Sequence, residues 1–294
     1  MEKRSSMDRL SALPDDIICH ILSFLPTKIS AATSILSRRW GFLWICVKKL
    51  DLWLEHATLP RCLFTCKTLV DLTLYDGCVG MPSSGPVFLP SLKKLHVCRV
   101  KYQDVEAFPQ LLSGCPVLEE LIIRYNYLDC FNISSPTIKR LTVQCERNNF
   151  DSSVKINAPE LRHLQLRDIA FAGSIVKFDN LTKLELGVEF CFLMKLLEIA
   201  DNLEVLILIV KPHNWMEPKQ VPTCLLLHLR TIKIDQFWFE GHEFNMVRYL
   251  LKNAQVLERM GIHLMYSDLK AKSYAVKRIS SFKRRSEACE LAFH

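Results

Sequence analysis

Residues 181–186 read Leu-Thr-Lys-Leu-Glu-Leu, and residues 203–208 read Leu-Glu-Val-Leu-Ile-Leu, which repeats the same leucine spacing 22 residues further along. This L-x-x-L-x-L pattern, with Ile, Val or Met in place of some leucines, recurs through most of the 294 residues. The steps between successive first positions are 23, 26, 20, 23, 20, 22, 26 and 28 residues. The copies begin at Leu69, Leu92, Leu118, Ile138, Leu161, Leu181, Leu203, Leu229 and Leu257, with a further copy ahead of them at Val47.

Periods of about 20–29 residues with this apolar core are typical of leucine-rich repeats, in which each repeat contributes one short strand. Stacked repeats bury the apolar positions and align the residues between them in rows on the concave face of a horseshoe. We therefore predict an α/β leucine-rich-repeat solenoid over residues 45–234, followed over 235–294 by a region that holds the last, degenerate repeat. A surface of this kind is far more often a binding surface than an active site.

The net charge of +7 is concentrated at the two ends of the chain. Residues 1–50 carry eight Lys and Arg against four acids, and residues 265–294 carry seven against three, which leaves −1 for residues 51–264. A repeat surface near neutrality has no long basic stripe to follow phosphates, so we predict no nucleic-acid partner. The basic ends, including Lys283-Arg284-Arg285, are interpreted as solvated tails.

The cysteines and the N-terminal residues favour a cytoplasmic or nuclear protein. The 12 cysteines are spread along the chain with no C-x-x-C pair, and residues 1–9 are charged, unlike a signal peptide. Reduced cysteines acting as small apolar residues fit this pattern. No uncharged apolar run approaches the 18 residues of a membrane span, so no membrane association is expected.

Motifs for catalysis or for cofactors are absent from the sequence. The nine histidines occur singly, and there is no Ser/His/Asp, H-E-x-x-H, Walker or G-x-G-x-x-G arrangement. We therefore predict no catalytic residue, no cofactor and no metal.

Residues 7–44 contain no repeat and read as three short helices. Ile17, Ile18, Ile21, Leu22 and Leu25 follow the spacing of one apolar helix face, and further apolar and aromatic residues follow up to position 44. Fewer than forty residues cannot bury a sizeable core alone, so this region is expected to pack against a neighbour or a partner.

Two stretches carry a family resemblance. Residues 8–28 (DRLSALPDDIICHILSFLPTK) and 33–40 (TSILSRRW), with Leu43-Trp44, resemble a plant F-box. Residues 221–225 (VPTCL), 229–234 (LRTIKI), 249–260 (YLLKNAQVLERM) and 286–290 (SEACE) resemble the FBD module that follows the repeats in a large plant family. One departure is the short stretch between Trp44 and the first repeat, where the family would have a longer one, so a segment of the family pattern is expected to be missing here.

The resemblance implies a substrate-recognition subunit of an SCF-type ubiquitin ligase. The F-box would bind a Skp-type adaptor, which sits on a cullin with its RING partner, and the repeats would bind a target protein for ubiquitination. The alternatives are a repeat scaffold whose F-box is vestigial and a small-molecule receptor on the same platform. The residues that the resemblance assigns to adaptor docking are Leu13, Pro14, Ile18, Ile21, Leu22, Leu25, Leu36 and Trp40.

The target-binding residues are sought among the outward positions of the strands. Val205, Ile207 and Ile209 form an outward apolar cluster within one repeat, and two repeats earlier the corresponding positions are polar. Exposed apolar groups with polar neighbours are candidate contact sites. The alternative is that the following loop, with Trp215 and Met216, folds back and covers them. The predicted set is His163, Gln165, Arg167, Val205, Ile207 and Ile209.

Overall fold

The computed structural model divides into two compact units, Met1–Leu121 and Ile122–His294. None of the helices within its described residues is long and apolar enough to cross a lipid bilayer. The structure describes residues 13–14, 17–18, 21, 48–53, 61–79, 87–102, 106–125, 130–145, 153–169, 177–187, 190–209, 215, 217–218, 220–265 and 268–294.

The first unit holds a parallel sheet that begins the repeats. Strands β1 (Lys49–Trp53), β2 (Asp71–Val79) and β3 (Lys94–Tyr102) pair in register, so that Leu50, Leu72 and Leu95 form one row. A 3-10 helix, η3 (Arg61–Thr65), connects β1 to β2, and helix α4 (Ala107–Ser113) follows β3.

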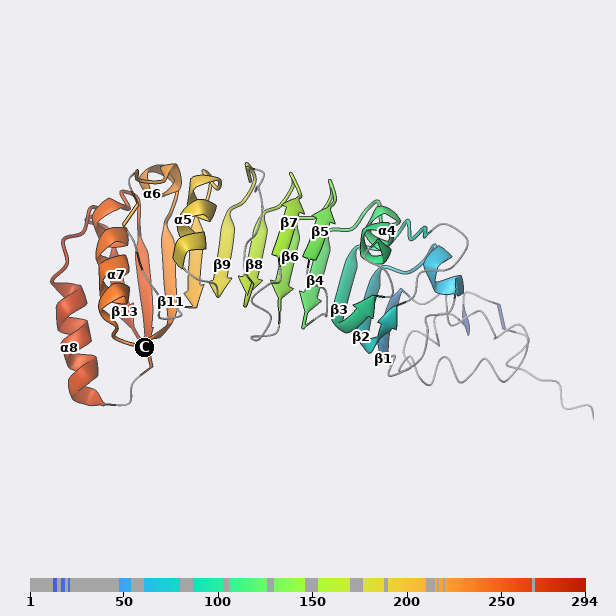
Figure 1. The fold of residues 1–294 in the computed structure, drawn as a ribbon, viewed down its shortest axis with the longest axis horizontal. Helices are drawn as coiled ribbons and strands as arrows, with labels where there is room; N and C mark the ends of the chain where they lie inside the picture. The colour runs from blue at the N-terminus through green and yellow to red at the C-terminus, as the bar shows by residue number, and fades with distance from the viewer. Residues whose placement is uncertain are drawn as a thin grey trace, which may run out of the picture. The chain divides into compact units, whose positions relative to one another are not determined.

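The second unit continues the same repeat pattern in a longer parallel sheet, whose strands Figure 1 shows side by side. Its strand order follows the chain, apart from a separate two-stranded sheet formed by β5 and β7. The elements are β4 (Glu120–Arg124, which crosses the unit boundary), β5 (Cys130–Ser134), β6 (Arg140–Gln144), β7 (Ser153–Asn157), β8 (His163–Arg167), β9 (Lys183–Gly187), α5 (Phe190–Glu198), β10 (Val205–Ile209), α6 (Thr223–Leu227), β11 (Thr231–Phe237), α7 (Gly241–Asn253), β12 (Arg259–Leu264), α8 (Leu269–Ser280) and β13 (Glu290–Phe293).

The apolar positions of the repeat pattern form the core, as predicted. The nine first positions from Leu69 to Leu257 are all fully buried, and the second and third positions pair with their equivalents on the neighbouring strands. Each buried leucine contributes about 2 kcal/mol of transfer free energy, so these repeated positions supply a large part of the apolar stabilisation. The row of second positions in the second unit runs Leu141, Leu164, Leu184, Leu206, Ile232, Met260 and Leu291.

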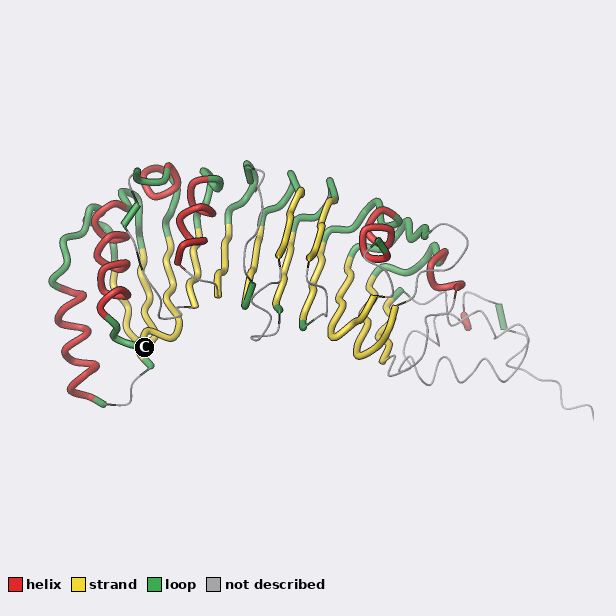
Figure 2. Tube along the Cα trace, viewed as in Figure 1, coloured by secondary structure: helices red, strands yellow, loops and turns green. Residues whose placement is uncertain are grey.

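The segments that return from one strand to the next change along the second unit. Figure 2 shows helices α5, α6 and α7 in the return segments after β9, β10 and β11. After β4 and β6 the return segments contain β5 and β7 instead, and Ile133, Val154 and Ile156 from these strands are buried. The α/β repeat architecture is confirmed, whereas the horseshoe curvature and the three-helix F-box stay predictions.

The basic C-terminal end is folded, and its interpretation as a solvated tail is wrong. Residues 269–280 form α8, whose Ala275 and Ile279 are buried, and β13 adds a further strand in register with β12. The Ser286 hydroxyl donates to the Leu257 carbonyl (2.6 Å) and fixes the connection between them. The sequence signal is weak because β13 offers only Leu291 and Phe293 at the apolar positions, while the cations around α8 and the following turn remain at the surface.

A buried carboxyl group shapes the turn between β11 and α7. Glu243 is fully buried and accepts hydrogen bonds from the backbone N–H groups of Trp238 (2.9 Å) and Glu240 (2.9 Å). Burial raises the pKa of Glu243 above its ordinary value of 4.5, and these hydrogen bonds partly oppose the shift. The carboxyl group thus satisfies the backbone donors at the start of α7 at the cost of its own hydration.

Glu243→Gln is predicted to change how stability depends on pH. Because the pKa is raised in the folded state, the folded wild-type chain holds this proton more tightly than the unfolded chain. Wild-type stability therefore falls as pH rises from about 4.5 through the raised pKa, and the variant lacks that contribution. Urea denaturation across this pH window should show the difference in unfolding free energy moving in favour of glutamine as pH rises. The exposed Glu287→Gln is the control, and parallel pH profiles for Glu243→Gln and wild type would contradict the assignment.

Candidate functional site: the outward face of the repeat sheet

A chain of hydrogen bonds crosses the outward face from β6 to β9. The Thr142 hydroxyl donates to Gln165 Oε1 (3.2 Å), and Gln165 Nε2 donates to Glu185 Oε1 (2.8 Å). The Arg167 guanidinium also pairs with Glu185, whose side chain is only 15% exposed. These four residues, called the polar ladder below, are aligned because the strands pair in register. Mutual hydrogen bonding holds their side chains in fixed positions before any partner arrives.

The predicted apolar cluster lies next to the polar ladder. Ile207 stands opposite Glu185 on β9 and Lys233 on β11, with Val205 and Ile209 before and after it on β10, and all three apolar side chains are half-buried. The structure therefore brings the two predicted clusters, on β8 and β10, to the two sides of β9. Sequence reasoning left Glu185 out, although it occupies the same place in its repeat as Gln165 and Ile207.

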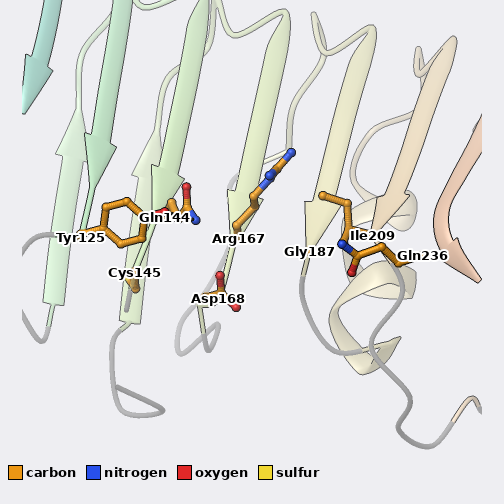
Figure 3. Close-up of a pocket in the computed structure, with 8 residues that line it drawn as sticks. All are labelled: Tyr125, Gln144, Cys145, Arg167, Asp168, Gly187, Ile209 and Gln236. Atoms are coloured by element: carbon orange, nitrogen blue, oxygen red, sulfur yellow. Dashed lines mark hydrogen bonds between the residues drawn. The ribbon is translucent and has the colours of Figure 1, made fainter. Parts of the chain in front are cut away.

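A shallow depression of about 330 Å³ lies at the ends of these strands. Figure 3 shows Tyr125 and Gln144 on one side of it and Ile209 and Gln236 on the other. Gln144 Nε2 donates to the Tyr125 hydroxyl (3.0 Å). The remaining lining residues are Cys145, Arg167, Asp168 and Gly187. The depression thus combines hydrogen-bonding groups with an apolar wall.

Three residues that line the depression share a positive φ angle, which recurs along the repeats. Five residues with positive φ each lie two positions after the third apolar residue of a repeat, and three of them line the depression. This conformation is costly for residues other than glycine, and its recurrence at the same position shows that it belongs to the backbone of the repeat itself. The five are Asp76 (φ 44°), Arg99 (φ 53°), Tyr125 (φ 53°), Asp168 (φ 55°) and Gln236 (φ 60°).

Gly187 allows Arg167 to reach Glu185. A Cβ atom at Gly187 would lie 3.2 Å from Arg167 Cγ on the neighbouring strand, so the arginine side chain lies across the space that another side chain would fill. Gly261 on β12 is different, because a Cβ atom there would meet nothing within 4 Å. Two glycines on the same sheet therefore have different roles.

Trp215 in the loop after β10 packs against α7, while residues 210–214 and 216 lie outside the described residues, so covering of the apolar cluster by this loop stays a prediction. The Trp215 ring lies 5.5 Å from the ring of Tyr249 on α7. His163, from the predicted set, lies on β8 between Arg140 and Lys183, two residues before Gln165 of the polar ladder. Among the predicted adaptor-binding residues, Leu13, Pro14, Ile18 and Ile21 are described, whereas Leu22, Leu25, Leu36 and Trp40 lie outside the described residues.

The described side chains offer little for catalysis. The six cysteines whose side chains the structure describes are free thiols, and burial raises the pKa of Cys115 and Cys224 to about 12, so that neither is a thiolate near neutral pH. Within the described ranges, no group of three or more His, Cys, Asp or Glu side chains could hold a metal ion.

The parallel sheet with one strand per 20–31 residues defines a leucine-rich-repeat protein. Three family models match along the chain: the F-box domain over residues 10–51, the repeats described as FBD-associated F-box protein At5g56370, LRR repeats, over 46–185, and FBD over 217–262. The chain belongs to the plant family of F-box/FBD/leucine-rich-repeat proteins. Proteins of this family are typically adaptors without catalysis of their own, and the F-box suggests a general role in SCF substrate recognition.

The chain is similar to several F-box proteins of Arabidopsis thaliana. FBD-associated F-box protein At3g52670 is 28% identical, with 97% of each chain covered. F-box/FBD/LRR-repeat protein At5g56420 is 26% identical over 98% of this chain and 99% of the relative. F-box/LRR-repeat protein At3g59250 is 33% identical over 62% of this chain and 53% of the relative.

The comparison with At3g52670 also shows that this chain is shorter than its relative. That alignment runs over 408 positions, whereas this chain has only 294 residues. More than a hundred positions of the relative therefore have no counterpart here. Because both chains are covered almost completely, most of these unmatched positions lie inside the relative's chain. The F-box and repeat models overlap over residues 46–51, which leaves no spacer between the two motifs.

The same substitution, glycine to valine, is predicted to have different effects at Gly187 and at Gly261. Gly187→Val should displace Arg167 from Glu185 and lower the unfolding free energy by about 1 kcal/mol, because a half-buried ion pair loses its geometry. Gly261→Val should leave stability unchanged or raise it, since a β-branched residue suits a strand and meets no neighbour. Urea denaturation of both variants measures the difference, and equal changes in both would contradict the role given to Gly187.

Proposed function

We propose that this protein is a substrate-recognition subunit of an SCF-type ubiquitin ligase. Its F-box binds a Skp-type adaptor, and through it the cullin and RING core, while the repeat sheet binds a target protein. The observation that carries the proposal is the direct succession of an F-box match and a repeat sheet with an ordered outward face. Such an assembly would act in the cytoplasm or the nucleus.

The described F-box residues suit partial burial by a partner. Ile18 is fully buried, whereas Ile17 and Ile21 are 48% and 39% exposed. Isoleucines left at the surface of a small helical motif gain free energy when a partner covers them. Of the predicted docking residues Ile18 and Ile21, Ile21 therefore offers the contact surface and Ile18 supports it from within.

The outward face of the second unit suits protein recognition. The polar ladder supplies fixed hydrogen-bonding groups, and Val205, Ile207 and Ile209 supply adjacent apolar surface. Interfaces commonly combine an apolar centre with a polar rim. Side chains that are already ordered lose less conformational entropy on binding, which favours affinity.

The proposed mechanism is proximity. Holding a target beside a ubiquitin-charged conjugating enzyme raises the effective concentration of its lysines at the reacting thioester, without catalysis by this chain. The absence of a spacer between the F-box and repeat matches favours a rigid arm over a flexible tether. A rigid arm fixes the orientation of the target.

The depression in Figure 3 favours one second candidate, a small-molecule receptor on the same platform. Its volume of about 330 Å³ falls at the lower end of the range for ligand pockets, and polar groups from several strands converge on it. In that case the ligand would occupy the space between Tyr125 and Ile209 and complete the surface that the target contacts. A saturable shift in melting temperature with one compound from a plant metabolite set, lost in Gln144→Ala, would favour this candidate.

Adaptor binding tests the main proposal. Ile21→Asp should reduce capture of a plant Skp-type adaptor at least tenfold, because it places a charge in the apolar contact. Val117→Asp is the matched control, since Val117 is 38% exposed and lies outside the F-box match. The double variant Leu13→Ala/Pro14→Ala should also lose binding.

The readout is a pull-down with purified adaptor, alongside circular dichroism to confirm folding of each variant. Absence of binding by the folded wild-type chain would contradict the proposal and leave a repeat scaffold with a vestigial F-box. Equal loss in Ile21→Asp and Val117→Asp would contradict the assigned contact.

A further inference from the structure

A second hollow lies on the outward face near the C-terminal end of the sheet. It has a volume of about 510 Å³, spans β11, β12 and β13, and is separate from the depression in Figure 3. We call it the C-terminal hollow. Its lining residues are Lys233, Ile234, Asp235, Arg259, Gly261, His263, Ala292 and His294.

The floor of the C-terminal hollow results from two small residues in register. Gly261 on β12 lies between Lys233 on β11 and Ala292 on β13. The equivalent places on β8, β9 and β10 hold Gln165, Glu185 and Ile207, whose side chains stand on the face. Because Gly261 has no side chain and Ala292 only a methyl group, the face is recessed here and an incoming side chain could reach the sheet.

Apolar surface lies one strand beyond the hollow, on the far side of Lys233. Ile207 stands directly opposite Lys233, which separates the apolar row of β10 from the floor at Gly261. The aliphatic part of a lysine side chain adds to apolar surface while its charged end stays in water. An extended segment crossing the strands would therefore meet apolar groups on β10 and then the recess.

The rim carries two cations without an ion pair among the described residues. Lys233 and Arg259 are both exposed, while the nearby Arg230 is paired with Glu258. The acidic side chains around the hollow are Asp235 on the rim and Glu290, opposite Arg259 in register, and neither forms an ion pair with these cations. The two cations are thus available to carboxylates of a partner.

We propose that the C-terminal hollow receives an extended acidic segment of the target protein. An aromatic side chain of that segment would lie over Gly261 and Ala292, and flanking carboxylates would pair with Lys233 and Arg259. An aromatic anchor in a recess with charged groups at its rim is the usual arrangement of an energetically dominant contact. This inference rests on the proposed function, since it names the chemistry of the target, and it assigns a binding role to part of the FBD match at residues 217–262.

The test measures binding of a fluorescein-labelled Glu-Glu-Trp-Glu-Glu peptide to the full chain by fluorescence anisotropy. Saturable binding is expected for this peptide, with affinity at least tenfold lower for Lys-Lys-Trp-Lys-Lys and for Glu-Glu-Ser-Glu-Glu. Gly261→Leu should fill the recess and weaken binding at least tenfold, without loss of stability, because a Cβ atom there meets nothing within 4 Å.

The charge requirement has a matched control on the same face. Lys233→Glu should weaken binding of the acidic peptide at least about fivefold, whereas Lys183→Glu, on β9 and away from the hollow, should not. Equal affinity in wild type and Gly261→Leu, similar affinity for the acidic and basic peptides, or no saturable binding up to about 1 mM would overturn the inference.

The same preparations are tested for capture of the Skp-type adaptor, which separates the two proposals. Adaptor binding without peptide binding overturns only the target chemistry proposed for the hollow. Peptide binding without adaptor binding supports the hollow as a binding site and contradicts the ligase role.

Discussion

The rest of the structure depends on one constraint, which is that the buried leucines of adjacent strands pair in register. Leu164, Leu184 and Leu206 lie opposite one another on adjacent strands and are fully buried. A shift of one residue in any strand would turn its leucines outward, so burial fixes the register of the whole sheet. The same register then decides which outward residues are neighbours, and therefore the polar ladder and the C-terminal hollow exist only because the leucines pair.

The sequence predicted the repeats well because their signal is periodic and their burial is nearly complete. It also placed Gln165, Arg167 and Ile207 on one face, since alternation along a strand determines which side chains point outward. It failed where the determinant was not periodic. The extra strands β5 and β7 form in return segments of irregular length, and β13 rests on two apolar residues within a basic stretch.

Contacts within the site were less predictable than its position. Glu185 is central to the polar ladder because it accepts from both Gln165 and Arg167, which requires Gly187 to leave space beside Arg167. The positive φ angles at Tyr125 and Gln236 belong to the backbone of the repeat, two positions after its third apolar residue. Neither feature has a residue pattern that distinguishes it from an ordinary surface position in a single sequence.

These features support a division of labour along the chain. The F-box match offers exposed isoleucines at one end, and the repeat sheet presents ordered side chains and a recess at the other. The chain lacks more than a hundred positions found in a relative of similar organisation, yet the rows of its repeats remain in register. The internal shortening therefore leaves the sheet that carries the outward face undisturbed.

The most direct test of the central claim is native mass spectrometry of this chain co-expressed with a plant Skp-type adaptor and the N-terminal half of a cullin. The account predicts one complex with a single copy of each of the three proteins. A spectrum that contains the adaptor–cullin pair and the folded chain as separate species would contradict it.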